Sequence, residues 1–327
     1  MNIEPIGGYG APIDLGALPA SLDALGELGV DHVALIPSFF QPRLGVAEIV
    51  WRDSRARVEA DTRSAIRMAH ERGLAVLLKP HLWLDERSDG AWRGDIDPDG
   101  ESWPRWERAY RDAVLGFARL GAQERVAGIS MGSELTRVAL AHPEFWRQLA
   151  SEIRQVFSGE ITYAANWDSE FEQIEWWDAV DHIGVDAFWP LTGDRQEVLD
   201  GDRCLERLDR VRNAMAAVAA RYERPVVLTE VGYKSASGAA YRPWEWHDDQ
   251  VADVTVQATA YACLAESFGT VAGDALRAPA GGDAGWLIGM YFWIWHTDLG
   301  WGGPGNSDFT PYGKPAQEIL RAWFRTR

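Results

Sequence analysis

VVLTEVGY, residues 226–233, decides the fold of this chain. Val226, Val227 and Leu228 form a continuous apolar run, which is the pattern of a parallel strand buried on both faces. The run continues to Glu230 without a turn residue, so a carboxylate stands where a buried strand ends. Glu230 is either an ordinary solvated loop residue or, if a second carboxylate faces it, part of a chemical site.

Strand-like and helix-like segments alternate on both sides of this stretch. Apolar runs lie at residues 32–36, 74–78, 126–129, 161–165, 182–185, 226–229 and 287–292. Helical patterns lie at 17–28, 58–72, 103–120, 143–157, 203–222, 247–267 and 312–325, with a short one near 171–179. Strands that alternate with helices indicate βα units and a parallel sheet.

Seven such strands, preceded by a very short one within residues 3–9, predict an α/β fold, a single (β/α)8 TIM barrel with a shortened first strand. We expect one catalytic domain over residues 1–327, because no change in composition marks a boundary. A doubly wound sheet is disfavoured because no glycine-rich fingerprint follows the first strand.

The composition excludes several classes of partner. The 327 residues carry a net charge of −17, which argues against nucleic acid and anionic membrane surfaces. No run approaches the roughly 18 apolar residues of a membrane span. The first residues have neither a basic nor an apolar segment of a signal peptide, so we expect a cytoplasmic protein. No sequence feature indicates an oligomeric state.

Two residue types add detail. Cys204 and Cys263 both fall in amphipathic helical patterns, so two buried thiols are expected rather than a disulfide or a zinc site. The 17 tryptophans gather in segments expected to be loops. Indoles have an apolar face and a polar edge, which suits a ligand that is half apolar and half hydroxylated.

Glu134 is the second carboxylate. Chemistry in a (β/α)8 barrel lies where the carboxyl ends of the strands open into loops. Glu134 follows the fourth strand and Glu230 the seventh, and three steps around an eight-strand ring lead nearly to the opposite side. We therefore expect the two side chains to face each other over the barrel mouth. For each glutamate alone, a surface charge or a salt-bridge partner is the alternative.

Two carboxylates that flank a cleft among indoles are typical of an enzyme that cleaves a glycosidic bond. One protonates the leaving oxygen, and the other attacks the anomeric carbon or activates water. The side chains of a retaining enzyme lie roughly 5–5.5 Å apart, and those of an inverting enzyme about 6.5–9.5 Å apart.

Seven segments resemble glycoside hydrolase family 113, over about residues 7–320. They are KPHLW (79–83), AWRGDI (91–96), GSEL (132–135), ANWD (165–168), GVDAFWPL (184–191), TEVGY (229–233) and FWIW (292–295). The family comprises retaining β-mannanases and related β-mannosidases. The resemblance implies that Glu134 is the acid/base and Glu230 the nucleophile, with a carbohydrate substrate, no metal and no cofactor.

The resemblance also implies a set of substrate-binding residues. His81, Trp92, Arg93, Asn166 and Trp167 fall at the family's subsite positions, and Asp186 lies at the end of the sixth strand. Trp92, Trp167, Trp293 and Trp295 are expected to be platforms for sugar rings. The family has Tyr where this chain has Phe188, which leaves the orientation of Glu230 to His81, Asn166 or Tyr233.

The mechanism sets two electrostatic expectations. Glu134 has to begin protonated, and we expect burial and its negative partner to keep it so. Glu230 has to remain ionised, which requires hydrogen-bond donors beside it.

Other readings of the sequence are weaker. A metal-dependent hydrolase would use His81, His182, Asp186 and His296, but no HxH opens the first strand and His182 begins its strand. The acidic turn at 95–100 resembles the start of an EF-hand loop but has Trp106 at the twelfth position. A non-catalytic carbohydrate-binding barrel and a β-glycosidase of different sugar specificity stay open.

The aromatic loop at 234–247 would close one end of the cleft and favour exo action.

Overall fold

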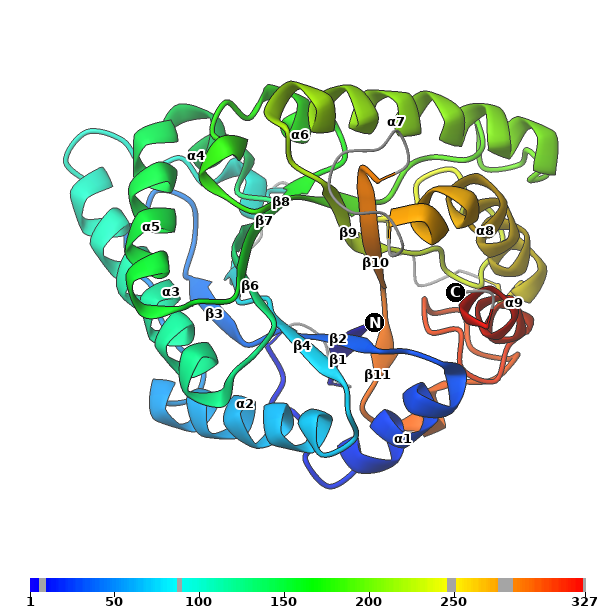
Figure 1. Ribbon diagram of the computed structural model, residues 1–327, viewed down its shortest axis with the longest axis horizontal. Helices are drawn as coiled ribbons and strands as arrows, with labels where there is room; N and C mark the ends of the chain where they lie inside the picture. The colour runs from blue at the N-terminus through cyan, green and yellow to red at the C-terminus, as the bar shows by residue number, and fades with distance from the viewer. Residues whose placement is uncertain (6–9, 87–89, 246–250, 276–284, 326–327) are drawn as a thin grey trace.

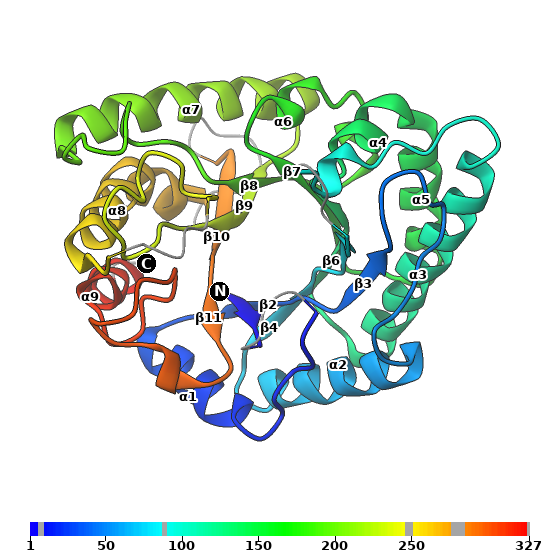
Figure 2. The same ribbon diagram turned by 180° about the vertical axis from the view of Figure 1, so that it is seen from behind.

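The strands of the protein form a ring surrounded by helices, as Figures 1 and 2 show from opposite sides. The computed structural model describes residues 1–5, 10–86, 90–245, 251–275 and 285–325, with the backbone alone at 270–275. The remaining residues include part of the expected first strand at 3–9 and part of the expected loop at 234–247, which therefore lie outside the described residues.

Nine parallel strands make the ring. In sequence order they are β1 (Asn2–Glu4), β2 (His32–Leu35), β4 (Ala75–Leu78), β6 (Gly128–Ser133), β7 (Glu160–Asn166), β8 (His182–Ala187), β9 (Val226–Val231), β10 (Leu287–Phe292) and β11 (Trp295–His296). Each strand pairs with the next in this order except that β10 does not pair with β11, which pairs with β1 instead. The eighth strand position of the barrel is shared by two short strands: β10 pairs with β9, and β11 pairs with β1. The predicted (β/α)8 barrel with a short first strand is confirmed.

A second sheet, of two strands, lies where the sequence pattern predicts no strand. β3 (Ser38–Gln41) pairs in parallel with β5 (His81–Leu84) just beyond β2 and β4. Both views place β3 between the ring and α3. Phe39 of β3 packs on Tyr110 and Phe117 of that helix, with ring centroids 5.9 and 6.4 Å apart. This packing orders the pair and extends one wall of the barrel mouth.

The helices lie outside the ring. They are α1 (Leu18–Leu28), α2 (Arg55–His70), α3 (Trp103–Glu124), α4 (Thr136–Ala141), α5 (Pro143–Val156), α6 (Glu170–Gln173), α7 (Gly201–Tyr222), α8 (Val254–Ala275) and α9 (Pro315–Phe324). Single 3-10 turns are η1 (Arg93–Asp95), η2 (Trp177–Ala179) and η3 (Leu299–Trp301). The expected helices are found with ends that differ by a few residues, except that the helix expected at 247–267 is α8, which begins seven and ends eight residues later. Residues 247–250 of that expected helix lie outside the described residues. The helix α2 begins earlier than expected because Ser54 accepts a hydrogen bond from the Arg57 amide and caps it.

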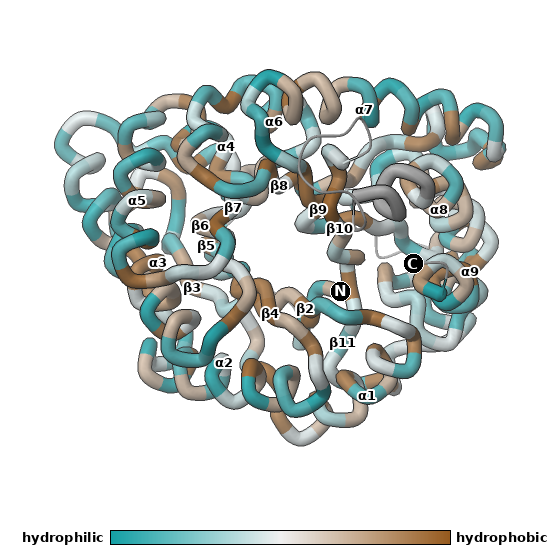
Figure 3. The backbone as a smooth tube through the Cα atoms, in the orientation of Figure 1, coloured by the Kyte–Doolittle hydropathy of each residue, from teal (hydrophilic) through white to brown (hydrophobic). Residues whose placement is uncertain are grey.

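The strands are apolar because both of their faces are buried. In β9, Val226 and Leu228 face the helices, and Val227 joins Ala34, Leu77 and Tyr291 in a separate core inside the ring. Figure 3 shows the hydrophobic colour concentrated on the strands and the hydrophilic colour on the outer helical surface.

Two further expectations can be compared with the structure. Cys204 and Cys263 are buried and free, as expected. Across the described ranges, every helix is too short or too polar to cross a membrane.

Candidate active site

A cleft of about 470 Å³ opens at the carboxyl ends of the strands. Its lining residues come from the ends of β5, β7 and β9 and from the segments that follow β5, β6, β7, β8, β9, β10 and β11. They are Trp83, Gly90, Trp92, Arg93, Glu134, Asn166, Trp167, Asp168, Phe188, Glu230, Trp244, Trp293 and Phe309. Both glutamates singled out from the sequence therefore face one cleft, as expected.

Glu134 follows β6 in a backbone conformation that side chains seldom adopt. Its φ of 50° lies in the left-handed region, which costs a non-glycine residue roughly 1–2 kcal/mol. Two hydrogen bonds hold the turn: the Glu134 amide donates to the Ala164 carbonyl, and the Leu135 amide donates to the Tyr163 hydroxyl, both at 2.8 Å. Such strain is common where a fold fixes a functional side chain.

Both carboxylate oxygens of Glu134 have donors on the cleft wall. Arg93 donates to Oε2 from Nε at 3.1 Å and also from Nη2. Asn166 donates to Oε1 at 2.8 Å. The sequence suggests Asn166 as a hydrogen-bond donor to Glu230, but in the structure Asn166 donates to Glu134 instead. Arg93 also forms an ion pair with Glu134, which gives this carboxylate a positive partner beside the negative one expected from the sequence.

Glu230 is anchored from below by a lysine. Lys79, at the end of β4, donates from Nζ to Glu230 Oε1 at 2.5 Å. His81 Nε2 lies 3.6 Å from the same oxygen. Burial raises the pKa of Glu230 to about 8; Asp186 and Glu134 also raise it, while Lys79 and Arg93 oppose the rise.

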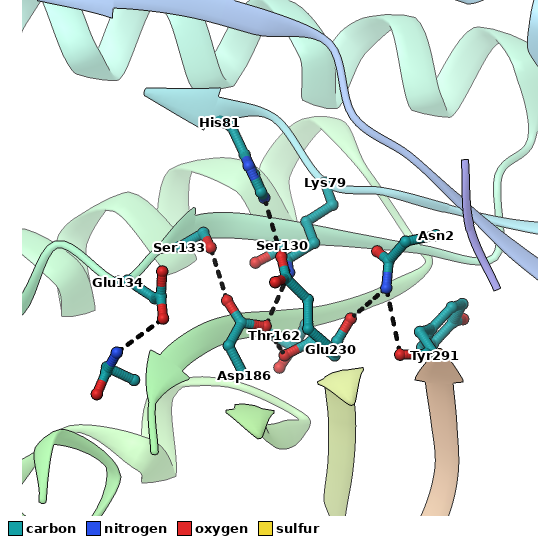
Figure 4. Close-up of polar contacts among 12 residues, drawn as sticks. Asn2, Lys79, His81, Ser130, Ser133, Glu134, Thr162, Asp186, Glu230 and Tyr291 are labelled. Carbon is teal, nitrogen blue, oxygen red and sulfur yellow. Dashed lines mark hydrogen bonds and ion pairs between the residues drawn. The ribbon is translucent and has the colours of Figure 1, made fainter. Parts of the chain in front are cut away.

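Asp186 connects Lys79 to the barrel. It accepts three hydrogen bonds, each of 2.8 Å, from Lys79 Nζ, Ser133 Oγ and Thr229 Oγ1. Figure 4 shows Lys79, Ser133 and Asp186 lying close to Glu230 and Glu134. Asp186 is fully buried and does not line the cleft, so it lies under the substrate site rather than in it.

His81 is also beneath the cleft surface. Its ring is fully buried, with Trp83 edge-on at 5.2 Å and Trp293 stacked at 6.5 Å. Burial lowers the pKa of His81 well below its usual value, and Arg93 and Lys79 lower it further. The imidazole is therefore neutral near pH 7 and can act only as a neutral hydrogen-bonding group.

The family model described as Glycoside Hydrolase Family 113 matches residues 16–314. The chain belongs to glycoside hydrolase family 113. It is therefore a glycoside hydrolase, as the sequence segments predicted, and no curated protein matches the sequence.

Solved structures agree with the family. A β-mannanase of family 113, AaManA from Alicyclobacillus acidocaldarius in complex with ManMIm, has 26% identity and a TM-score of 0.79, covering 100% of this chain and 96% of its own. A family 113 β-1,4-mannanase, solved as a complex, has 23% identity and a TM-score of 0.79, covering 100% and 98%. A family 5 mannosidase from Rhizomucor miehei shares the fold at 10% identity and a TM-score of 0.66, covering 95% and 87%.

Five of the predicted substrate-binding residues of this family 113 chain line the cleft: Trp92, Arg93, Asn166, Trp167 and Trp293. Tyr233 and Trp295 do not. The Tyr233 hydroxyl donates to the Trp189 carbonyl at 2.9 Å, and the Trp295 ring packs on Tyr312 at 5.3 Å. Both side chains are fully buried in the layer between strands and helices.

A strand irregularity explains why Tyr233 faces away. Pairing between β8 and β9 shifts register between Leu228 and Glu230. Strict alternation would turn Glu230 toward the helices together with Val226 and Leu228. The shift turns Glu230 into the cleft and sends Val231 and Tyr233 outward. The break between β10 and β11 likewise puts the two neighbouring tryptophans on different sides: Trp293 lines the cleft, and Trp295 packs between strands and helices.

Several residues of the site were not predicted. Lys79 stood in the quoted segment KPHLW, and a lysine directly after an apolar strand was a usable signal. Trp83, Trp244 and Phe309 line the cleft as well. Trp244 belongs to the loop expected to close one end, and its ring lies 5.1 Å from that of Trp167.

Glu170 is an unpredicted buried support. It accepts hydrogen bonds from the Tyr163 hydroxyl at 2.7 Å, the Asn166 amide at 2.8 Å and the Thr136 hydroxyl at 2.9 Å. Burial raises its pKa to about 7, against the effect of these donors. Glu170 thereby ties the segment after Glu134 to the segment that carries Asn166.

The residues of the metal-site alternative are dispersed. His182 lies beside Glu160 at the start of β8, and His296 bonds Asp308 at 2.9 Å. Within the described ranges, no three His, Cys, Asp or Glu side chains gather in a way that would hold a metal ion.

Proposed function

We propose that this family 113 protein is a retaining hydrolase of β-linked mannose-containing oligo- or polysaccharides, and that residues 1–327 form its single catalytic domain. The observation that carries the proposal is that Glu134 and Glu230 line one cleft, at the ends of β6 and β9, the fourth and seventh strands of the ring. Two similar structures are described as β-mannanases, which supports mannose as the sugar.

In the proposed first step, Glu230 attacks the anomeric carbon and Glu134 gives its proton to the leaving oxygen. The glycosidic bond breaks as the bond to Glu230 forms. In the second step, Glu134 takes a proton from water, whose oxygen attacks the same carbon and releases Glu230. Glu134 suits proton exchange because its side chain is 9% exposed, against 3% for Glu230.

The number of charged groups at the floor of the cleft fits a mechanism in which the carboxylates share one mobile proton. Lys79 and Arg93 are cations, and Glu134, Glu230 and Asp186 are the carboxylates they contact. With all five groups charged the cluster has one excess negative charge, so a single added proton makes it neutral. For Glu134 to hold that proton when the sugar binds, its ion pair with Arg93 has to open.

The aromatic lining supports a carbohydrate ligand. Trp92, Trp167 and Trp293 line the cleft from separate segments and would stack on the apolar faces of sugar rings. Asn166 and Arg93 supply donors next to Glu134 that can be shared with sugar hydroxyls.

The test is to incubate the protein with aryl β-mannoside, β-glucoside and β-galactoside and with a β-1,4-linked mannooligosaccharide. We expect fastest release from the mannosides, and NMR of the first product should show the β anomer. An α anomer would refute retention, and preference for another sugar would refute the mannan assignment. Binding of the oligosaccharide without release from any substrate would indicate a non-catalytic barrel.

A further inference from the structure

Lys79 occupies an unusual position for a lysine. It follows the apolar strand β4, and its side chain has no exposed surface. Buried ammonium groups are costly unless they are paired and hydrogen-bonded. Its Nζ lies 2.8 Å from Asp186 Oδ1 and 2.5 Å from Glu230 Oε1, so one ammonium joins two carboxylates from neighbouring strands.

Asp186 is held independently of Lys79. Ser133 at the end of β6 donates to Oδ2, and Thr229 of β9 donates to Oδ1. Ser133 directly precedes Glu134, and Thr229 directly precedes Glu230. The Asp186 carboxylate therefore touches the strands that carry both members of the carboxylate pair, and Lys79 extends this anchor to Glu230 itself.

Charged and titratable groups from several segments lie around Lys79. They are Asp186 on β8, Glu230 on β9, His81 on β5, Arg93 on η1 and Glu134 after β6. His81 is neutral, and Arg93 is occupied with Glu134. Lys79 is thus the cation in direct contact with Glu230 among the described residues.

We propose that Lys79 is a positioning residue of the reaction: anchored by Asp186, its ammonium fixes the Glu230 carboxylate and favours the charged form that attacks the sugar (Figure 4). The inference rests on the proposed function, because it needs Glu230 as the nucleophile. A buried ion pair beneath the cleft thus takes the role for which His81, Asn166 and Tyr233 are the candidates from the sequence.

Opposite effects of two substitutions distinguish this role from simple structural support. Lys79→Met removes the cation and leaves two adjacent carboxylates, so Glu230 takes up a proton more readily. The acid limb of kcat/KM should move to higher pH, with about 10- to 1000-fold lower activity near pH 7. Asp186→Asn removes the neighbouring negative charge, and the acid limb should move to lower pH. The double variant should return the limb toward the wild-type position.

The experiment measures kcat/KM of an aryl β-mannoside against pH for the wild type, both single variants and the double variant. Lys314→Met is the matched control, because Lys314 is also buried but donates to Asn306 and to the Asp308 carbonyl, both at 3.0 Å. Its acid limb should stay in place. If Lys79→Met does not fold, the downward shift in Asp186→Asn still tests the proposal.

The outcomes separate the inference from the proposed function. Wild-type turnover with unchanged acid limbs in Lys79→Met and Asp186→Asn would overturn the role of Lys79 and leave the hydrolase assignment intact. Equal shifts of the same sign in both variants would likewise overturn it. A wild-type protein that hydrolyses none of the mannosides would overturn the proposed function itself.

Discussion

Glu134 and Glu230 share one cleft but are held in different ways. Glu134 stands on a left-handed turn and is bonded by Arg93 and Asn166, both of which line the cleft and can be reached by substrate. Glu230 stands on an irregular strand and is bonded by Lys79, which has no exposed surface. A substrate can therefore rearrange the surroundings of Glu134 while those of Glu230 stay fixed.

This difference matches the two proposed tasks. A nucleophile has to hold one position and begin the attack charged, which favours a buried anchor. An acid/base has to gain and lose a proton within each turnover, which favours partners that can be displaced.

The largest expected effect is that of Glu230→Gln, which removes the attacking oxygen. We expect turnover of every substrate to fall by about 10⁴-fold or more, because the variant has no nucleophile. Peptide mass spectrometry after treatment of the wild type with an activated 2-fluoro-mannoside should find the sugar on Glu230. Recovery of the label on Glu134 would reverse the roles of the pair.

Glu134→Gln should discriminate between leaving groups. We expect about 10²- to 10⁴-fold slower cleavage of a mannooligosaccharide, since its leaving oxygen needs a proton. The bond-breaking step of an aryl mannoside with an acidic phenol should be affected far less, and burst kinetics would measure it. An equal loss on both substrates would count against the acid role.

Glu170→Gln should disturb the Glu134 side of the cleft alone. The amide of Gln cannot accept all three donors, and an unsatisfied buried donor costs about 1–3 kcal/mol. We expect a melting temperature lower by several degrees and an increased KM, because Asn166 loses its support. Glu172→Gln, an exposed position on the same helix, is the control and should change neither quantity.

The smallest effect concerns stability and pH. The pKa of Glu230 is about 8 when folded against an ordinary value of 4.5, so the folded chain binds the extra proton between these values. Its contribution to stability is full below about pH 4.5 and is lost as pH rises through about 8. The difference in unfolding free energy between wild type and Glu230→Gln should therefore fall over this range in urea titrations. A difference that grows with pH would contradict the assigned burial.

The repeating units and the shared cleft of the two glutamates could be predicted because they depend on local pattern and on barrel symmetry. Apolar runs indicate the strands, and the carboxyl ends of the strands open at one end of the barrel, where Glu134 and Glu230 both line the cleft. The charge partners could not be predicted in the same way. Lys79 and Asp186 meet only after the ring closes, and sequence order alone did not pair them. Tyr233 and Trp295 were expected in the cleft but lie outside it. The inward and outward alternation of side chains is interrupted at the register shift in β9 and at the break between β10 and β11.

The indoles around the cleft have a practical consequence. Trp83, Trp92, Trp167, Trp244 and Trp293 surround the space where a sugar would lie. A ring stacked on any of them would displace water from its face and alter its emission. Intrinsic fluorescence should thus report occupancy in Glu230→Gln, giving an equilibrium titration of natural oligosaccharides that needs no turnover and no dye.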